Sequence, residues 1–187
     1  MRNLTIIGLL LLATTYVNAQ NSSQQSPFQT NYTEDRFSIG LGAGLDYGGL
    51  GGNLNYYLAE SVGLFGGVGY ALAGVGSNAG LKYRYIPKKP EARVRPFALA
   101  MYGYNAAIVV LNASQYNKMF YGPTFGAGID LRSKAQKRGY WSLGVFVPLR
   151  KAEVKEYMDD LENNIGADFS NSLFPVTISI GYKFIIL

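Results

Sequence analysis

The sequence predicts an all-β protein: an eight-stranded antiparallel up-and-down transmembrane β-barrel with one short helix in its last extracellular loop. Three observations predict this fold. From Phe37 to Phe184 apolar side chains alternate with small or polar ones, which is the period of a strand. Only 16% of the 187 residues are charged, against about 25% in a typical soluble domain. Beyond residue 17 no apolar run approaches the ~20 residues that a membrane helix needs.

The composition also excludes several kinds of site. The chain has no Cys, which excludes disulfides, thiolate metal sites, Cys nucleophiles and the lipid-modified Cys of a lipoprotein. It has no His, which excludes His general bases, His-based triads and the usual zinc sites. We therefore expect no catalytic, cofactor-binding or metal site, and no cofactor.

Residues 1–19 are predicted to be a signal peptide. Arg2 supplies a short positive region, an apolar stretch follows, and Val17-Asn18-Ala19 is a cleavage site that leaves Gln20 as the first mature residue. A permanent N-terminal anchor is the competing interpretation, which the short apolar stretch disfavours.

Residues 20–35 are predicted to be a flexible periplasmic leader, and residues 36–187 to be the barrel. The leader is rich in Ser, Gln, Asn and Thr, and such a composition buries too little apolar surface to offset the entropy of ordering. A short partner-binding segment around Phe28 and Tyr32 is the alternative.

The first four strands are predicted between residues 37 and 85. Their more apolar faces hold, in chain order, Phe37, Ile39, Leu41, Ala43, Leu45 and Tyr47, then Leu50, Leu54, Tyr56 and Leu58, then Val62, Leu64, Val68 and Tyr70, then Val75, Ala79, Leu81, Tyr83 and Tyr85. The opposite faces hold mainly Gly, Ser and Asn, with Asp46, Lys82 and Arg84 as charges.

The last four strands are predicted between residues 97 and 184. Their apolar faces hold Phe97, Leu99 and Met101, then Tyr121, Phe125, Ala127, Ile129 and Leu131, then Trp141, Leu143, Val145, Val147 and Leu149, then Val176, Ile178, Ile180, Tyr182 and Phe184. The opposite faces include Ala98, Ala100 and Tyr102 in the fifth strand, and otherwise Gly, Ser and Thr with Phe146, Asp130 and Lys183.

The apolar faces are expected to contact lipid. A soluble barrel would present a Lys/Glu-rich surface, whereas the second face here is dominated by Gly, which suits the lining of a narrow lumen. Aromatic side chains near strand ends also indicate an interfacial girdle, formed by Tyr47, Tyr56, Tyr70, Tyr85 and Trp141. An inside-out soluble barrel is the alternative.

These features resemble the small eight-stranded bacterial outer-membrane barrels, the family of the OmpA transmembrane domain and OmpX. The resemblance covers Phe37 to Phe184 and is most specific in the last strand, where Val176, Ile178, Ile180, Tyr182 and Phe184 are similar to the signal read by the barrel-assembly machinery. It implies location in the bacterial outer membrane, with outer-membrane lipid and the assembly machinery as partners.

With both ends periplasmic, as the resemblance implies, the two longest connections, residues 105–118 and 150–172, are extracellular. Loop 150–172 carries six acids against three cations, so we expect either an extracellular partner or divalent cations there, or simply a solvated loop. Lys151–Asn164 is predicted to be a helix that packs an apolar stripe over the barrel mouth, or serves as a partner platform. No nucleic acid is expected, because the cations lie on turns and the sequence has no recognition helix or RNA-binding motif.

Polar and charged residues on the inward faces predict a lumen polar network of Asp46, Asn53, Asn55, Lys82, Arg84, Asp130 and Lys183. Unpaired charges in a narrow lumen are costly, so a paired structural plug is expected, with a proton or ion path as the alternative. The resulting functional hypothesis is a non-enzymatic barrel with a structural, envelope-stabilising or surface-interaction role. A His-independent lipid-modifying enzyme and a narrow solute channel are the alternatives.

Overall fold

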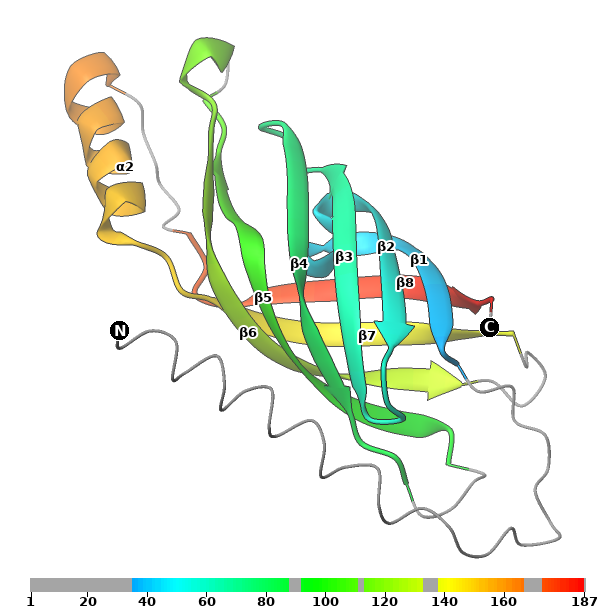
Figure 1. Cartoon of the computed structure of the whole chain (residues 1–187). Coiled ribbons are helices and arrows are strands. Elements are labelled where there is room, and N and C mark those ends of the chain that lie inside the picture. The colour runs from blue at the N-terminus through cyan, green and yellow to red at the C-terminus, as the bar shows by residue number, and fades with distance from the viewer. Residues whose placement is uncertain (1–34, 88–91, 111–112, 133–137, 167–172, 187) are drawn as a thin grey trace, which may run out of the picture. The chain divides into compact units, whose positions relative to one another are not determined.

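In a computed structural model, the chain forms a closed barrel of eight antiparallel strands in sequence order (Figure 1). The structure describes residues 35–87, 92–110, 113–132, 138–166 and 173–186. The predicted signal peptide and all of the predicted leader except Asp35 lie outside these residues. The predicted class, a closed antiparallel barrel with one short helix between its last two strands, is confirmed.

Each strand pairs with its neighbours along the chain, and β1 closes the barrel against β8 through pairs such as Leu41 with Tyr182. The strands are β1 (Phe37–Gly44), β2 (Gly49–Tyr57), β3 (Val62–Tyr70), β4 (Val75–Arg84), β5 (Val94–Ile108), β6 (Lys118–Arg132), β7 (Gly139–Pro148) and β8 (Thr177–Ile185). Within the described residues no helix has the length and apolarity needed to cross a membrane.

The inward and outward faces follow the predicted alternation in seven of the strands. Exposed side chains include Leu41, Tyr56, Val68, Leu81, Phe125, Val145 and Ile178, while Gly, Ser, Asn and charged residues alternate with them on the buried face. The outer surface is thus rich in Leu, Val, Ile, Tyr and Phe, which is the reverse of a water-soluble barrel.

The fifth strand is the exception, and its predicted faces are wrong. Phe97, Leu99 and Met101 are buried inside the barrel, whereas Tyr102 is exposed. Inside, they join a hydrophobic cluster that is completed by Leu45, Phe65 and Phe146. Both faces of this strand are apolar, so alternation alone could not distinguish them.

The first strand ends three residues before the predicted end, because the chain turns into the lumen. Leu45–Tyr47 forms a 3-10 turn, η1, whose three side chains are all buried. The turn is entered and left through Gly44, with φ 142°, and Gly48, with φ 70°, and L side chains rarely adopt such angles. Leu45 and Tyr47 are therefore lumen residues. This corrects the prediction that both contact lipid and the assignment of Tyr47 to the interfacial girdle.

The hairpin of β5 and β6 extends beyond its neighbours. Its pairing continues to Ile108 and Lys118, past a register shift between Tyr104 and Ala106. The predicted loop 105–118 therefore begins later than expected, because residues 105–108 belong to β5. By contrast, β4 pairs with β5 only up to Gly103, and β7 pairs with β6 only up to Pro148.

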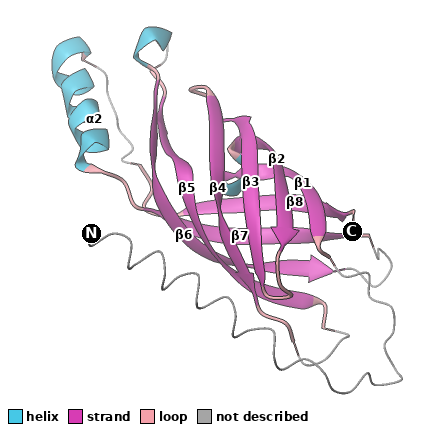
Figure 2. Ribbon diagram, viewed as in Figure 1, coloured by secondary structure: helices cyan, strands magenta, loops and turns pink. Residues whose placement is uncertain are grey.

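The helix α2 (Ala152–Ile165) lies beside this extension (Figure 2), and side chains from both pack into one hydrophobic cluster. The buried side chains Val154 and Leu161 contact a cluster with Ala106, Ile108 and Phe120. Phe120 has the same strand parity as the lumen residue Thr124, so α2 covers a continuation of the inner wall of the barrel. The predicted helix is present, and its apolar stripe packs on this hairpin.

Candidate functional site

The lumen contains all seven residues of the predicted polar network. Every one of them is at most 6% exposed. They come from η1, β2, β4, β6 and β8, and the strand alternation aims them at the barrel axis. Their hydrogen bonds divide them into three groups, which lie at different places along the lumen.

The first group centres on Asp130. Its two carboxylate oxygens accept bonds from Lys82 Nζ and from Ser142 Oγ, each at 2.7 Å. Lys82 Nζ also lies 3.8 Å from the centre of the Phe97 ring. A further hydrogen bond to the carboxylate and a ring face beside the ammonium group help to offset the cost of removing both charges from water.

The second group connects η1 to β2 and β8, the two strands that flank β1. Asp46 accepts hydrogen bonds from Ser179 Oγ and from Asn53 Nδ2, the latter at 3.4 Å. Asn55 Nδ2 donates to Asn53 Oδ1, and Lys183 Nζ donates to Asn55 Oδ1, each at 3.2 Å. Lys183 therefore reaches the Asp46 carboxylate through two amide side chains.

The third group lies at the end of the lumen where β4 ends. Arg84 donates from Nε to the Glu60 carbonyl at 2.6 Å and from a terminal nitrogen to Asp35 Oδ2 at 3.2 Å. Arg132 donates to the same Asp35 oxygen at 3.2 Å. Tyr57 lies under Arg84, with its ring centre 3.6 Å from the guanidinium carbon.

Asp35 and Arg132 are lumen residues that the sequence analysis missed. Asp35 was assigned to the flexible leader, yet it is only 3% exposed and joins two arginines. It precedes β1, so no strand parity could assign its direction. Arg132 lies two residues after Asp130 in the same strand, so its side chain is on the same face. The alternation in the sequence could therefore have predicted that Arg132 points inward.

Asn78 is a third lumen residue that was not predicted, and it holds η1 in place. Its amide nitrogen donates to the Leu45 carbonyl at 2.5 Å and to the Tyr104 carbonyl at 3.1 Å. One side chain thus ties the inward turn to the start of the β5–β6 extension. Its inward parity was visible in the sequence.

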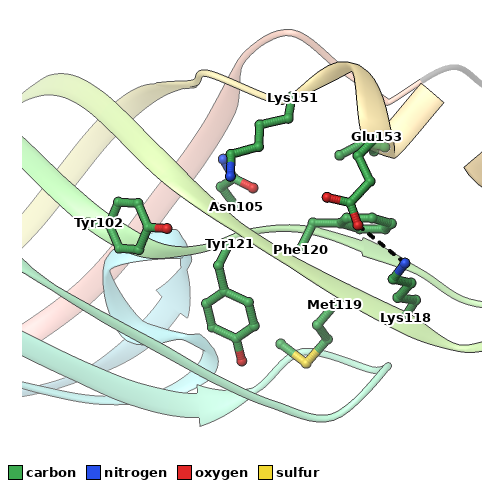
Figure 3. A pocket seen from close by; sticks show the side chains of 9 residues that line it. Tyr102, Asn105, Lys118, Met119, Phe120, Tyr121, Lys151 and Glu153 are labelled. Carbon is green, nitrogen blue, oxygen red and sulfur yellow. Dashed lines mark hydrogen bonds and ion pairs between the residues drawn. The ribbon is translucent and has the colours of Figure 1, made fainter. Parts of the chain in front are cut away.

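A cleft of about 260 Å³ lies between the β5–β6 hairpin and the start of α2 (Figure 3). Lys118 and Glu153 face each other across it at 3.4 Å, and both are substantially exposed. The remaining lining residues are Tyr102, Asn105, Met119, Phe120, Tyr121, Lys151 and Val154. Its charged lining is open to solvent, and the exposed pair contributes little to stability.

Arg150 joins the two ends of the connection between β7 and β8. It donates to the Leu173 carbonyl at 3.3 Å and to the Phe174 carbonyl at 2.7 Å. Partial burial lowers the pKa of its guanidinium, which nevertheless stays charged near neutral pH.

The predicted assembly signal lies on the outer surface of the last strand. Val176 precedes β8, and Ile178, Ile180 and Phe184 are exposed. Tyr182 packs edge-to-face against Trp141, with ring centres 5.3 Å apart.

The Ser142 hydroxyl and the acidic side chains are the remaining groups to consider for catalysis and metal binding. The Ser142 hydroxyl donates to Asp130, and the Asp130 carboxylate is already neutralised by Lys82, so no free base faces the hydroxyl. Among the described residues no group of three or more acidic side chains could hold a metal ion. Comparisons with models of protein families, with curated proteins and with solved structures found no match.

Proposed function

We propose that this protein is a bacterial outer-membrane β-barrel with a structural, envelope-stabilising or surface-interaction role, and that it is not an enzyme. The observation that carries the proposal is the inverted polarity of the barrel. Large apolar side chains are exposed on the outside, while Lys82, Lys183 and Asp130 are at most 3% exposed inside. This polarity suits a barrel with lipid outside and a polar interior.

The filled lumen supports a structural role over a narrow solute channel. The η1 turn contacts six of the eight strands, and the cluster around Phe97 and Phe146 occupies the space beside it. Eight strands enclose an interior that side chains can fill. In this barrel the η1 turn fills part of that interior in addition to the side chains of the strands.

The same filling supports a non-enzymatic role. The hydrolase alternative needs an activated nucleophile that a lipid can reach. Ser142 is 4% exposed, and its hydrogen bond to Asp130 leaves no base to accept its proton. No observation on the molecule favours this alternative.

A surface-interaction role is supported by the protruding β5–β6 hairpin and α2. The helix presents Glu153, Glu156, Asp159, Asp160 and Glu162 as exposed side chains, and its apolar side is already covered by the hairpin. An extracellular partner would meet an acidic face. In this proposal, loop 150–172 supplies the contact, while the barrel surface contacts lipid and β8 carries the assembly signal.

The test of the membrane location is Val145→Arg. Val145 is 52% exposed and lies between Trp141 and Val147 on the outer face of β7. Arginine near the bilayer midplane costs about 2–4 kcal/mol, so the variant should fold into lipid vesicles with a lower free energy of unfolding than Val145→Ala. Cell fractionation of the wild type should place it in the outer membrane. Recovery in the soluble fraction, with Val145→Arg as stable as Val145→Ala, would show that the outer surface faces water.

A further inference from the structure

Three arginines from consecutive strands converge at one end of the lumen. Arg84 ends β4, Arg95 lies near the start of β5, and Arg132 ends β6. Arg84 and Arg132 share one oxygen of Asp35, and Arg95 lies within electrostatic range of all three. We call these four residues the arginine cluster.

The arginine cluster carries more positive charge than its own acid can balance. Among the described residues, three guanidinium groups share one carboxylate, which leaves an excess of two positive charges within the cluster. Asp130, which lies opposite Arg95 in the pairing of β5 and β6, is already paired with Lys82. Like charges in a partly buried space repel each other strongly, so this excess favours a bound anion.

Unsatisfied polar atoms are also concentrated at this end of the lumen. Within the described residues, Asp35 Oδ1, Tyr57 Oη, Arg95 Nε and Arg132 Nε are buried without a hydrogen-bond partner. Three of these atoms carry donor hydrogens. Buried donors are nearly always paired in proteins, and several orphaned donors around one excess of charge indicate an absent acceptor.

We propose that the arginine cluster binds a phosphate group, either as free phosphate or as the headgroup of a phospholipid. A phosphate group carries roughly −1.5 to −2 charges at neutral pH and three acceptor oxygens, which matches the excess charge and the donors. Guanidinium forks bind such oxygens in pairs, and Tyr57 and Tyr140 supply ring faces beneath Arg84 and Arg132. The site requires only the closed barrel, so it stands apart from the proposed membrane location.

The first experiment titrates inorganic phosphate into the full chain folded in an uncharged maltoside detergent at low salt. One phosphate should bind per chain. Arg95→Gln should weaken binding at least tenfold, because it removes one guanidinium group from the site. The substitution breaks no ion pair among the described residues, so a loss of binding would not reflect a lost ion pair. The matched control is Arg93→Gln, which removes one exposed charge at the same end of the barrel and should leave the affinity within twofold. Absence of binding, or an equal loss in both variants, would overturn the proposal.

The second experiment removes the competing carboxylate with Asp35→Asn. In phosphate-free buffer this variant should unfold at a lower temperature, because Arg84 and Arg132 lose their shared partner. Phosphate should restore the midpoint and bind more tightly than to the wild type, whereas chloride at equal ionic strength should do neither. If Asp35 has only a structural role, phosphate will not restore the midpoint, and the proposal fails.

The source of the phosphate is identified by a third titration. A short-chain phosphatidic acid, used below its micelle-forming concentration, should bind more tightly than inorganic phosphate if the ligand is a lipid headgroup. If inorganic phosphate binds more tightly, the ligand is the free ion. In both cases Arg95→Gln should abolish the preference.

Discussion

The carboxylate of Asp130 is the most highly connected charge in the lumen. It accepts a hydrogen bond on each oxygen, from Lys82 and from Ser142, and Lys82 also lies over the ring of Phe97. Removing such an acid leaves the lysine charge buried without compensation, which is the costly way to break a buried ion pair. Stability at this site therefore depends on the pair being complete.

Asp130→Asn should lower the free energy of unfolding by about 3–5 kcal/mol, as expected when one partner of a buried ion pair is lost. The control is Glu153→Gln, which breaks the exposed ion pair with Lys118 and should cost less than about 1 kcal/mol. Urea unfolding of both variants in lipid vesicles measures the difference. Equal costs would mean that water reaches Lys82 freely.

The η1 turn explains why the inner wall contains so much glycine. A Cβ atom on Gly67 would collide with the Asp46 carbonyl, and one on Gly181 would collide with the Tyr47 ring. These glycines have ordinary extended backbones, so they are required by the close approach of η1 rather than by their own conformation.

Gly67→Ala should destabilise the barrel by about 1–3 kcal/mol, because the added methyl group has no space beside η1. The adjacent Gly66→Ala is the control. Its Cβ would meet nothing closer than the Asn78 carbonyl at 4.0 Å, so its effect should stay below about 1 kcal/mol. Thermal unfolding in detergent compares the two. If both variants behave alike, η1 does not occupy the lumen in solution.

The helix α2 belongs to a second, smaller core outside the barrel. Val154 and Leu161 pack against Ile108 and Phe120, and Tyr157 Oη donates to the Tyr116 carbonyl at 2.9 Å. This cluster has no residue in common with the hydrophobic cluster around Phe97 inside the barrel. Its loss should therefore release the helix without unfolding the strands.

Leu161→Ala should weaken this smaller core by about 2–5 kcal/mol, the usual cost of truncating a buried leucine. The helix region should then be cleaved faster by a protease, while the urea midpoint of the barrel stays unchanged. Glu162→Ala, at the exposed neighbouring position, should be cleaved at the wild-type rate. A matching fall in barrel stability would show that α2 and the strands unfold together.

At the scale of the whole molecule, the barrel is filled from end to end by different kinds of contact. The arginine cluster occupies one end, the Lys82–Asp130 pair follows, and η1 with the Phe97 cluster occupies the space beyond. We expect a lumen packed in this way to lack a continuous aqueous path.

The full chain in a planar lipid bilayer should therefore show no steady ion current. Asp130→Asn should also remain closed, because the neutral side chain keeps nearly the same volume. The comparison is a bilayer that received detergent alone. A steady current through the wild type would support the narrow solute channel, and a current through the variant alone would make Asp130 a gate.

The amino-acid sequence alone is enough to predict the class of fold, the approximate strand positions and the outward face of seven strands. The physical reason is local, because the side chains of a strand alternate with period two. Where one face is apolar and the other is rich in Gly, the sequence shows which face points outward and which points inward. The same rule placed Lys82, Asp130 and Lys183 inside, because each interrupts an inward face of small residues.

Only the tertiary structure decided the rest, since those features depend on contacts between distant segments. The inward face of β5 is decided by the packing of Phe97 against the cluster that contains Phe65 and Phe146. Because both faces of β5 are apolar, the alternation of its side chains cannot show which face points inward. Tyr47 turns inward because glycines on other strands leave room for its ring. Asp35 lies outside any strand, so the alternation rule does not apply to it. Its two ion pairs form because the closed barrel brings Arg84 at the end of β4 and Arg132 at the end of β6 to the same opening.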